Sequence, residues 1–420
     1  MYAFKITGGI PLNGTIEVKG AKNAILPMMA AALLTDEPVT LENVSYLSDV
    51  KIQSQLLESL GVKITHHENA ITLQADKITS YRAAYEFVSK MRASFWVLGP
   101  LVGRFGRAAV SLPGGCAIGA RPSDIYFAAL ESMGAVVKIE NGYVIAKGPL
   151  HSADISFRRI SVGATHNTIM AAVLTKGVTT IYNAAREPEV VDLINLLNKM
   201  GAKIDGAGTN KITITGVEKL HGTTHSVVTD RIETASFAIA AALTKGNIFI
   251  KGGQKELIEP IAETLQMCDV VFTQTPEGLH TDATNAILRP TSIATSEYPG
   301  FPTDAQSPIT TLLALANGTS FIEERIYENR FMHVPELNRM GANITVLPND
   351  TIRIKGVNCL SGATVMSSDL RGGMALVLAG LIAKGTTTVK RIYHIERGYY
   401  KLEDRLKALG AKIERIYMIE

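Results

Sequence analysis

Cysteine is scarce in this chain of 420 residues, which contains Cys116, Cys268 and Cys359 and no other. Their odd number, their wide separation and the lack of CxxC or Cys/His spacings argue against a disulfide framework and against a zinc site. An HExxH motif is also missing. The sequence therefore predicts neither a structural disulfide nor a bound metal.

Long apolar runs are missing as well. A transmembrane helix needs ~18 apolar residues in succession, and the longest run here, residues 372–383, is bounded by Arg371 and Lys384. The N-terminal sequence MYAFKITGG lacks the apolar region of a secretory signal. These absences predict a cytoplasmic protein without a membrane partner.

Strong charge and the common nucleotide motifs are absent too. The net charge of +3 is small for this length, which argues against nonspecific binding of nucleic acid. Neither GxxxxGK[ST] nor a GxGxxG between strand and helix occurs. If the protein binds phosphate, we expect arginine side chains and helix N-termini to hold it. No cofactor is predicted.

Internal repetition, by contrast, is abundant. Six stretches end in nearly the same five residues, namely residues 60–64 (LGVKI), 133–137 (MGAVV), 200–204 (MGAKI), 267–271 (MCDVV), 340–344 (MGANI) and 409–413 (LGAKI). Their starts are separated by 73, 67, 67, 73 and 69 residues (133−60, 200−133, 267−200, 340−267, 409−340). The glycine fits the C′ position of a helix, and the β-branched residues after it suit a strand. The chain is therefore predicted to be a sixfold internal repeat.

Each repeat contains two helix candidates of different character. One is amphipathic, ends in the repeated glycine and can lie near solvent. The other is apolar on nearly all sides and must be buried; these helices are expected at residues 24–34, 95–102, 168–174, 235–243, 309–316 and 374–383. Because a single core rarely grows beyond roughly 250–300 residues, we predict an α/β protein with two barrel-like domains of three repeats each.

Function is expected where the repeats differ. Residues 111–122 (SLPGGCAIGARP) form an insertion in the second repeat, and its glycines let the backbone approach a ligand closely. Cys116 lacks the apolar neighbours of a core cysteine, and its glycine-rich surroundings favour a chemical role. For Cys268, which replaces the repeated glycine, and for Cys359, we expect a structural role.

A second irregular segment, residues 296–304 (SEYPGFPTD), presents Asp304 just before a buried helix. Asp304 is either a cap of that helix or a functional carboxylate, and the local sequence does not decide between the two. Basic residues recur near the starts of repeats or in the glycine-rich loop, at Lys22, Arg92, Arg121, Arg371 and Arg397. Lys22 and Arg371 directly precede apolar helices, whose N-termini also favour anions, so these residues are predicted anion ligands.

Seven motifs link the whole chain to a known family: residues 20–24 (GAKNA), 112–122 (LPGGCAIGARP), 183–188 (NAAREP), 301–304 (FPTD), 328–336 (ENRFMHVPE), 369–371 (DLR) and 395–399 (IERGY). On these motifs the chain resembles the UDP-N-acetylglucosamine 1-carboxyvinyltransferases. The resemblance implies two inverse α/β barrels of three repeats. One would be formed by residues 21–229, and the other by residues 1–20 together with 230–420.

The resemblance also implies the chemistry. The enolpyruvyl group of phosphoenolpyruvate would pass to the 3′-hydroxyl of UDP-N-acetylglucosamine through a tetrahedral intermediate, with release of phosphate. Cys116 would be the proton donor and the target of the antibiotic fosfomycin, and Asp304 would be the base. Phosphoenolpyruvate would be held by Lys22, Asn23, Arg121, Arg371 and Arg397, of which Lys22 and Arg397 also count as catalytic.

A sugar-nucleotide site follows from the same resemblance. Its expected residues are Arg92, Arg121, Pro122, Ser123, Asp124, Ile125, Arg159, Ile160, Ser161, Val162, Asp304 and Ile326. The chain departs from the family at Tyr126, where a histidine is common, and at Arg159, where a lysine is common. Arg159 keeps the charge but changes the donor geometry, so we expect altered affinity and an unaltered reaction.

Three other functions compete with this interpretation. A 5-enolpyruvylshikimate-3-phosphate synthase would share the fold and the donor, but the Cys116 loop argues against it. A relative of the RNA 3′-phosphate cyclases would need nucleotide-adenylylating machinery, which the sequence lacks. A catalytically silent sugar-nucleotide-binding regulator would have no reason to retain Lys22, Cys116, Asp304 and Arg397 together.

Overall fold

The chain forms two compact units. The computed structural model describes residues 1–88, 92–112 and 124–418. Unit 1 contains residues 1–19 and the described residues from 229 onward, and unit 2 contains the described residues between 20 and 228. Each unit has a separate hydrophobic core, with Phe237 and Leu376 in that of unit 1 and Met28 and Leu197 in that of unit 2.

Within the described residues, each unit has three four-stranded sheets of one topology. Two parallel strands are followed by an antiparallel strand and then by an antiparallel edge strand. The sheets of unit 1 are β22 (Thr364–Met366), β23 (Thr386–Lys390), β1 (Tyr2–Thr7) and β24 (Lys412–Tyr417); β2 (Asn13–Glu17), β15 (Asn247–Lys251), β17 (Gly278–Asp282) and β16 (Val271–Thr275); and β18 (Ser292–Ala294), β19 (Thr319–Glu323), β21 (Thr351–Lys355) and β20 (Asn343–Leu347). Those of unit 2 are β14 (Thr223–Ser226), β3 (Val39–Glu42), β5 (Ala70–Gln74) and β4 (Lys63–His66); β6 (Arg82–Ala83), β7 (Arg107–Ser111), β9 (Tyr143–Lys147) and β8 (Val136–Glu140); and β10 (Asp154–Ser156), β11 (Val178–Tyr182), β13 (Lys211–Thr215) and β12 (Lys203–Asp205).

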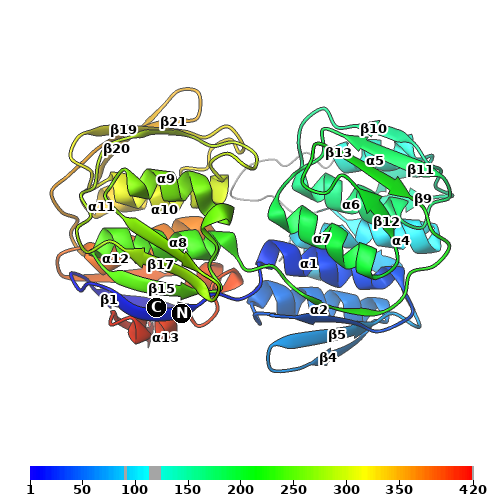
Figure 1. Ribbon diagram of the computed structural model, residues 1–420, viewed down its shortest axis with the longest axis horizontal. Coiled ribbons are helices and arrows are strands. Elements are labelled where there is room, and N and C mark those ends of the chain that lie inside the picture. Colours follow the sequence, from blue (N-terminus) through cyan, green and yellow to red (C-terminus); the bar gives the residue numbers. More distant parts are fainter. Residues whose placement is uncertain (89–91, 113–123, 419–420) are drawn as a thin grey trace. The chain divides into compact units, whose positions relative to one another are not determined.

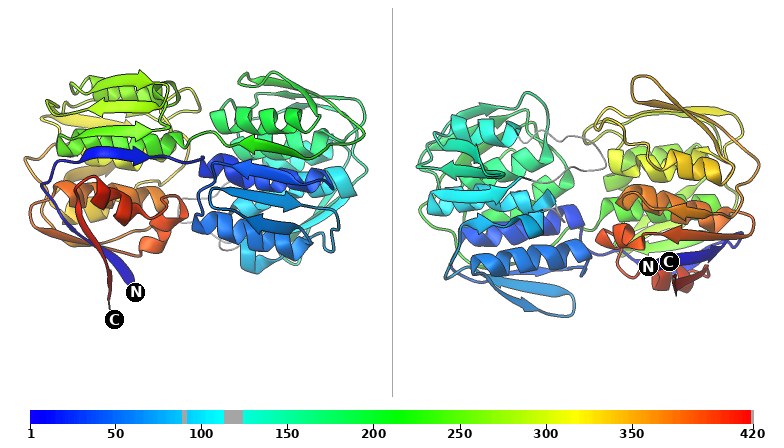
Figure 2. Two further views of the ribbon diagram at one scale, coloured as in Figure 1. Left: turned by 60° about the horizontal axis from the view of Figure 1, so that its bottom comes forward. Right: turned by 180° about the vertical axis from the view of Figure 1, so that it is seen from behind.

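The two ends of the chain close unit 1. Strand β1 lies between β23 and β24, and β2 pairs with β15, so the first residues complete sheets built from the C-terminal half. The N-terminal amine of Met1 donates to the carbonyl oxygen of Met418 at 2.8 Å, and the ends marked N and C lie side by side in Figures 1 and 2.

Three apolar helices fill the interior of each unit (Figure 1). Every residue of α8 is buried, because its alanine-rich sequence has no polar face to present to solvent. In unit 1 the helices α8, α10 and α12 contact one another. The inner helices are α8 (Arg231–Thr244), α10 (Thr303–Leu313) and α12 (Leu370–Ile382) in unit 1, and α1 (Lys22–Ala31) with η1 (Ala32–Leu34), η2 (Arg92–Val97) with α4 (Leu98–Phe105), and α6 (Val162–Ala172) in unit 2. The buried helices predicted from the apolar runs are therefore confirmed.

A second set of helices is amphipathic and ends at the repeated motif. These are α2 (Ser48–Leu60), α5 (Asp124–Ser132), α7 (Pro188–Lys199), α9 (Glu259–Gln266), α11 (Val334–Arg339) and α13 (Leu402–Ala408). The short elements α3 (Tyr85–Val88), η3 (Lys255–Ile258) and η4 (Ile392–Arg397) complete the described structure. Within the described residues, no helix has the length and the apolar character needed to span a bilayer.

The repeated glycines have the conformation that the sequence predicts. Gly61, Gly201 and Gly410 have φ values of 106°, 100° and 96°. In the fourth repeat, where Cys268 replaces the glycine, the positive φ of 62° falls on Asp269 instead. Aspartate tolerates this left-handed conformation better than a thiol-bearing or β-branched residue. The predicted α/β class and the sixfold repeat are confirmed.

Two of these glycines allow backbone strain to be separated from steric clash. A Cβ added to Gly201 (φ 100°) would meet only the exposed His221 side chain, at 3.2 Å, whereas one added to Gly61 (φ 106°) would lie 2.5 Å from the carbonyl oxygen of Lys77. We expect Gly201→Ala to lower the free energy of unfolding by about 1–2 kcal/mol, and Gly61→Ala to lower it by roughly a further 1–3 kcal/mol. Urea unfolding of unit 2, followed by fluorescence of the chain's single tryptophan, Trp96, measures both. Equal losses would show that the Lys77 backbone moves away freely.

Candidate active site

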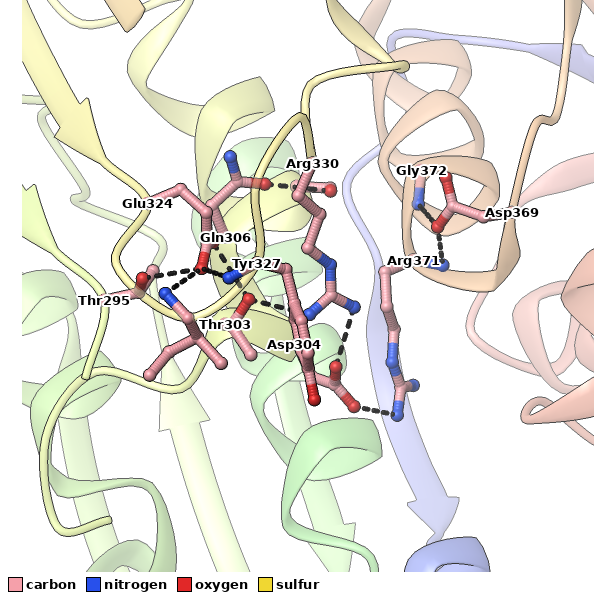
Figure 3. Close-up of polar contacts among 12 residues, drawn as sticks. Thr295, Thr303, Asp304, Gln306, Glu324, Tyr327, Arg330, Asp369, Arg371 and Gly372 are labelled. Carbon is pink, nitrogen blue, oxygen red and sulfur yellow. Dashed lines mark hydrogen bonds and ion pairs between the residues drawn. The ribbon is translucent and has the colours of Figure 1, made fainter. Parts of the chain in front are cut away.

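In unit 1, the carboxylate of Asp304 is paired with two buried arginines. One oxygen of Asp304, Oδ1, accepts from Arg330 Nη2 at 2.7 Å, and the other, Oδ2, accepts from Arg371 Nη2 at 2.8 Å. The arginine side chains are 5% and 4% exposed and that of Asp304 is 25% exposed, so the carboxylate is the member of the triad nearest to solvent. Figure 3 shows Asp304 between the two guanidinium groups.

The position of Asp304 comes from the start of α10. The helix begins at Thr303, and Pro302 is its N-cap residue, so Asp304 lies inside the first turn. Arg371 lies in the first turn of α12, where Asp369 caps the helix by accepting from the backbone N–H groups of Arg371 and Gly372. The open question of cap or functional carboxylate is answered in part: both oxygens of Asp304 pair with arginines.

Charge balance favours a bound anion here. Burial lowers the pKa of Arg371, but Asp304, Tyr399 and Asp230 together outweigh burial and hold this pKa above its usual range. The triad itself, two guanidinium groups and one carboxylate, has a charge of +1, and the N-terminal end of α10 adds to it, whereas the Asp369 carboxylate caps the end of α12. The two guanidinium groups of the triad therefore suit an anionic ligand.

Further contacts hold Arg371 from the side of η4. Its Nη1 donates to the Tyr399 hydroxyl at 3.5 Å, and that hydroxyl also hydrogen-bonds to Ser236 at 2.7 Å. Burial raises the pKa of Tyr399, so the phenol stays protonated. Arg397, another predicted phosphoenolpyruvate ligand, is the last residue of η4 and is half-buried, and Ile326 is half-buried in the segment between β19 and α11.

In unit 2, the predicted anion ligands occupy the start of α1. Lys22 is the first residue of the helix, and its Nζ lies 3.6 Å from Oδ2 of Asp49, whose side chain is 1% exposed. Asn23 follows it and is half-buried. The buried Asp49 carboxylate thus helps to hold the Lys22 ammonium near the helix N-terminus.

Four of the predicted sugar-nucleotide residues, 159–162, lie at the start of α6. Ser161 caps this helix by accepting from the backbone N–H of Ala164 at 3.3 Å, and Val162 begins it. Arg159 is exposed and Ile160 is half-buried just before it. The Tyr126 hydroxyl lies against Gly163, where an added Cβ would come within 1.9 Å of it, so a glycine is needed next to this tyrosine.

Two predicted residues at the start of α5, Asp124 and Ile125, lie in different surroundings. Asp124 forms an ion pair with Arg158. Ile125 is 4% exposed and belongs to the core of unit 2, so its side chain serves packing first. Arg92 is the first residue of η2. Cys116, Arg121, Pro122 and Ser123 lie outside the described residues.

Sequence reasoning missed Arg330 as a site residue. It lies within the quoted motif at residues 328–336, but 26 positions after Asp304, and no local spacing indicates that the two side chains meet. Asp49 was missed for the same reason. Within the part of the chain that the structure describes, no group of three or more histidine, cysteine, aspartate or glutamate side chains could hold a metal ion.

Comparison with known proteins identifies the family. The family model for EPSP synthase (3-phosphoshikimate 1-carboxyvinyltransferase) matches residues 6–406, and the chain belongs to this family of carboxyvinyltransferases. A UDP-N-acetylglucosamine 1-carboxyvinyltransferase of Afipia carboxidovorans is 49% identical over 99% of the chain and 100% of the relative, and one of Glaesserella parasuis serovar 5 is 50% identical over 99% and 98%. Within the family, the chain thus belongs with the UDP-N-acetylglucosamine 1-carboxyvinyltransferases.

Solved structures agree on the fold. The enolpyruvyl transferase NikO from Streptomyces tendae superposes with a TM-score of 0.88 at 23% identity, covering 99% of this chain and 98% of that one. EPSP synthase from Acinetobacter baumannii gives a TM-score of 0.75 at 18% identity, covering 99% and 100%. At these identities the likeness concerns the fold alone, and it confirms the predicted fold class.

A buried histidine within α6 gives the stability of unit 2 a pH dependence. His166 is fully buried and packs edge-on against Trp96, with ring centroids 5.7 Å apart, and burial lowers its pKa from 6.5 to about 4. Between these values the unfolded chain binds more protons at His166 than the folded chain does. Stability must therefore fall as the pH falls from 6.5 toward 4, by up to about 1.4 kcal/mol per pH unit.

We expect His166→Leu to lose less stability than the parent protein between pH 6.5 and 4.5. Urea midpoints followed by Trp96 fluorescence at several pH values measure the slope for unit 2. The control is His221→Gln, which changes an exposed histidine of the same unit and should leave the slope unchanged. An unaltered slope in His166→Leu would mean that other groups cause the loss of stability at acidic pH.

Proposed function

We propose that this protein transfers the enolpyruvyl group of phosphoenolpyruvate to the 3′-hydroxyl of UDP-N-acetylglucosamine, with release of phosphate, as the first committed step of peptidoglycan synthesis in the cytoplasm. The observation that carries the proposal is 48–50% identity, over nearly the whole chain, to proteins named UDP-N-acetylglucosamine 1-carboxyvinyltransferase. The clamped carboxylate of unit 1 supports it, because the reaction needs both a base and cations for an anionic donor.

The reaction proceeds by addition and elimination. In the addition, the sugar hydroxyl oxygen bonds to C2 of phosphoenolpyruvate, its proton passes to a base, and C3 takes a proton from an acid. In the elimination, C3 loses a proton, the bond between C2 and the phosphate oxygen breaks, and phosphate leaves with the electron pair. Asp304 is the proposed base and Cys116 the proposed acid.

Cationic side chains are the proposed ligands of phosphoenolpyruvate. We assign the phosphate and carboxylate of phosphoenolpyruvate to Lys22, Arg121, Arg371 and Arg397, with Asn23 beside the reacting centre. Cationic groups at fixed positions stabilise negative charge and orient the donor at the same time. Arg330 is not one of these ligands; its ion pair holds the carboxylate of Asp304.

The sugar nucleotide is assigned to a second set of residues. The proposed residues are Arg92, residues 121–125, residues 159–162, Asp304 and Ile326. The start of α6 supports this assignment, because a helix N-terminus with an exposed arginine beside it suits a diphosphate.

Phosphate release separates the proposal from its competitors. We expect phosphoenolpyruvate to release inorganic phosphate when UDP-N-acetylglucosamine is present and not when shikimate 3-phosphate replaces it. A colorimetric phosphate assay with each acceptor measures this. Release with shikimate 3-phosphate would establish the synthase activity instead, and UDP-N-acetylglucosamine binding without release would identify a silent regulator.

The base assignment is tested at Asp304. We expect Asp304→Asn to lower kcat by ~10²–10⁴, because the amide keeps the size of the side chain but cannot take up the hydroxyl proton. Binding of UDP-N-acetylglucosamine, measured by calorimetry, should weaken far less. The matched control is Asp269→Asn, which removes an exposed aspartate from its ion pair with Arg289.

Asp304→Asn also leaves two buried guanidinium groups without their carboxylate. Breaking a buried ion pair in this way lowers the free energy of unfolding by about 3–5 kcal/mol. Turnover must therefore be measured below the unfolding midpoint of the variant. An Asp304→Asn protein that is folded and keeps more than about a tenth of the parent rate contradicts the assignment.

A further inference from the structure

A buried carboxylate without an ion pair lies behind the clamp of unit 1. Glu324 follows strand β19 and is 4% exposed. Among the residues that the structure describes, it makes no salt bridge, and four hydrogen-bond donors surround it instead. Oε1 accepts from the Thr295 hydroxyl and the backbone N–H groups of Ile326 and Tyr327, and Oε2 accepts from the Thr303 hydroxyl. Such donors stabilise an ionised carboxylate as a nearby cation would.

The hydrogen bonds beyond Glu324 have a fixed direction. A carboxylate can only accept, so the Thr303 hydroxyl must donate its one hydrogen to Glu324 Oε2, at 2.9 Å. Its lone pair then accepts from Arg330 Nη1 at 2.7 Å, and Arg330 Nη2 donates to Asp304 at 2.7 Å. The chain Glu324–Thr303–Arg330–Asp304, drawn in Figure 3, therefore admits a single arrangement of its protons.

Glu324 also fixes Arg330 from a second side. It accepts the backbone N–H of Tyr327 at 3.1 Å, and the Tyr327 ring centroid lies 5.4 Å from the central carbon of the Arg330 guanidinium group. Arg330 is thus held by Asp304, by the Thr303 hydroxyl and by the Tyr327 ring. Two of these three contacts are placed by Glu324.

The geometry points to Glu324 and Thr303 as positioning residues of this enzyme: through Arg330, they orient the Asp304 carboxylate for the sugar hydroxyl. This inference rests on the proposed function. Neither side chain is assigned to a substrate. Glu324 has the additional task of folding the segment that carries Ile326, since the backbone N–H of Ile326 donates to it at 2.9 Å.

Glu324 both orients Arg330 and holds the Ile326 segment, whereas Thr303 only orients Arg330. Substitutions at Thr303 and at Glu324 should therefore have different kinetic effects. Loss of the Thr303 hydroxyl removes the contact to Arg330 and leaves the Ile326 segment attached to Glu324. Such a change should lower kcat with little change in the KM for UDP-N-acetylglucosamine. Loss of the Glu324 charge disturbs both tasks and should lower kcat and raise this KM together.

The chain offers matched variants for the test. Thr303→Val removes the hydroxyl but keeps the shape of the side chain, and Thr303→Ser restores the hydroxyl. Thr295→Val removes another donor to the same carboxylate, one with no contact to Arg330 in the described structure. It also removes the acceptor of the Arg325 backbone N–H, so its unfolding midpoint reports that separate loss. Glu324→Gln keeps the size of the side chain, while Glu323→Gln changes its half-buried neighbour, whose partner is Arg325.

We expect Thr303→Val to lower kcat by roughly 10–100-fold, because small misplacements of reacting groups have effects of this size. Thr303→Ser should recover most of the loss, and Thr295→Val and Glu323→Gln should stay within about threefold of the parent rate. Glu324→Gln should lower kcat at least as much as Thr303→Val and raise the KM. Unfolding midpoints accompany each measurement, and the Thr303 pair carries the test if Glu324→Gln does not fold.

The activity of the parent protein separates a failure of the proposed function from a failure of the positioning role. A parent without UDP-N-acetylglucosamine-dependent phosphate release contradicts the proposed function itself. With an active parent, the positioning role is overturned if Thr303→Val keeps the parent kcat. It is also overturned if Thr303→Val and Thr295→Val lower kcat equally, or if Thr303→Ser restores the unfolding midpoint without restoring kcat.

Discussion

The need to enclose three apolar helices decides where each unit can place charge. The bodies of α8, α10 and α12 are buried on all sides, so ionisable groups are confined to their ends. Asp304 and Arg371 both lie in the first turns of such helices, and Lys22 occupies the same place on α1 in unit 2. The helix ends therefore hold the charged side chains, while the rest of each helix forms the hydrophobic core.

This arrangement explains why the carboxylate and the arginines depend on one another. A cation such as Arg371 is disfavoured by burial and by the positive end of its own helix. The Asp304 carboxylate pairs with Arg371, the Asp369 carboxylate caps the helix end, and Arg330 places a second cation beside Asp304. The net positive charge of the Asp304–Arg330–Arg371 triad suits an anionic ligand.

The Asp304 triad lies where the sixfold repeat departs from its common pattern. All six sheets of the described structure share one strand order, and the inner helices follow one pattern. The segment between β19 and α11 departs from it, since the buried Glu324 gathers four donors there and directs Arg330 toward Asp304. In the fourth repeat the departure is milder, because Asp269 takes the left-handed conformation that glycine has elsewhere.

Local sequence determined the repeat, the burial of the apolar helices and the glycines that end the amphipathic ones, because these features depend on residues three or four positions apart. The motifs determined the family and named Lys22, Asp304 and Arg371. Only the tertiary structure decided that Asp304 pairs with Arg330 and Arg371, at separations of 26 and 67 residues, and that Glu324 lies buried behind them. Contacts between residues so distant in sequence arise from the packing of whole elements, for which neither propensity nor spacing contains a signal.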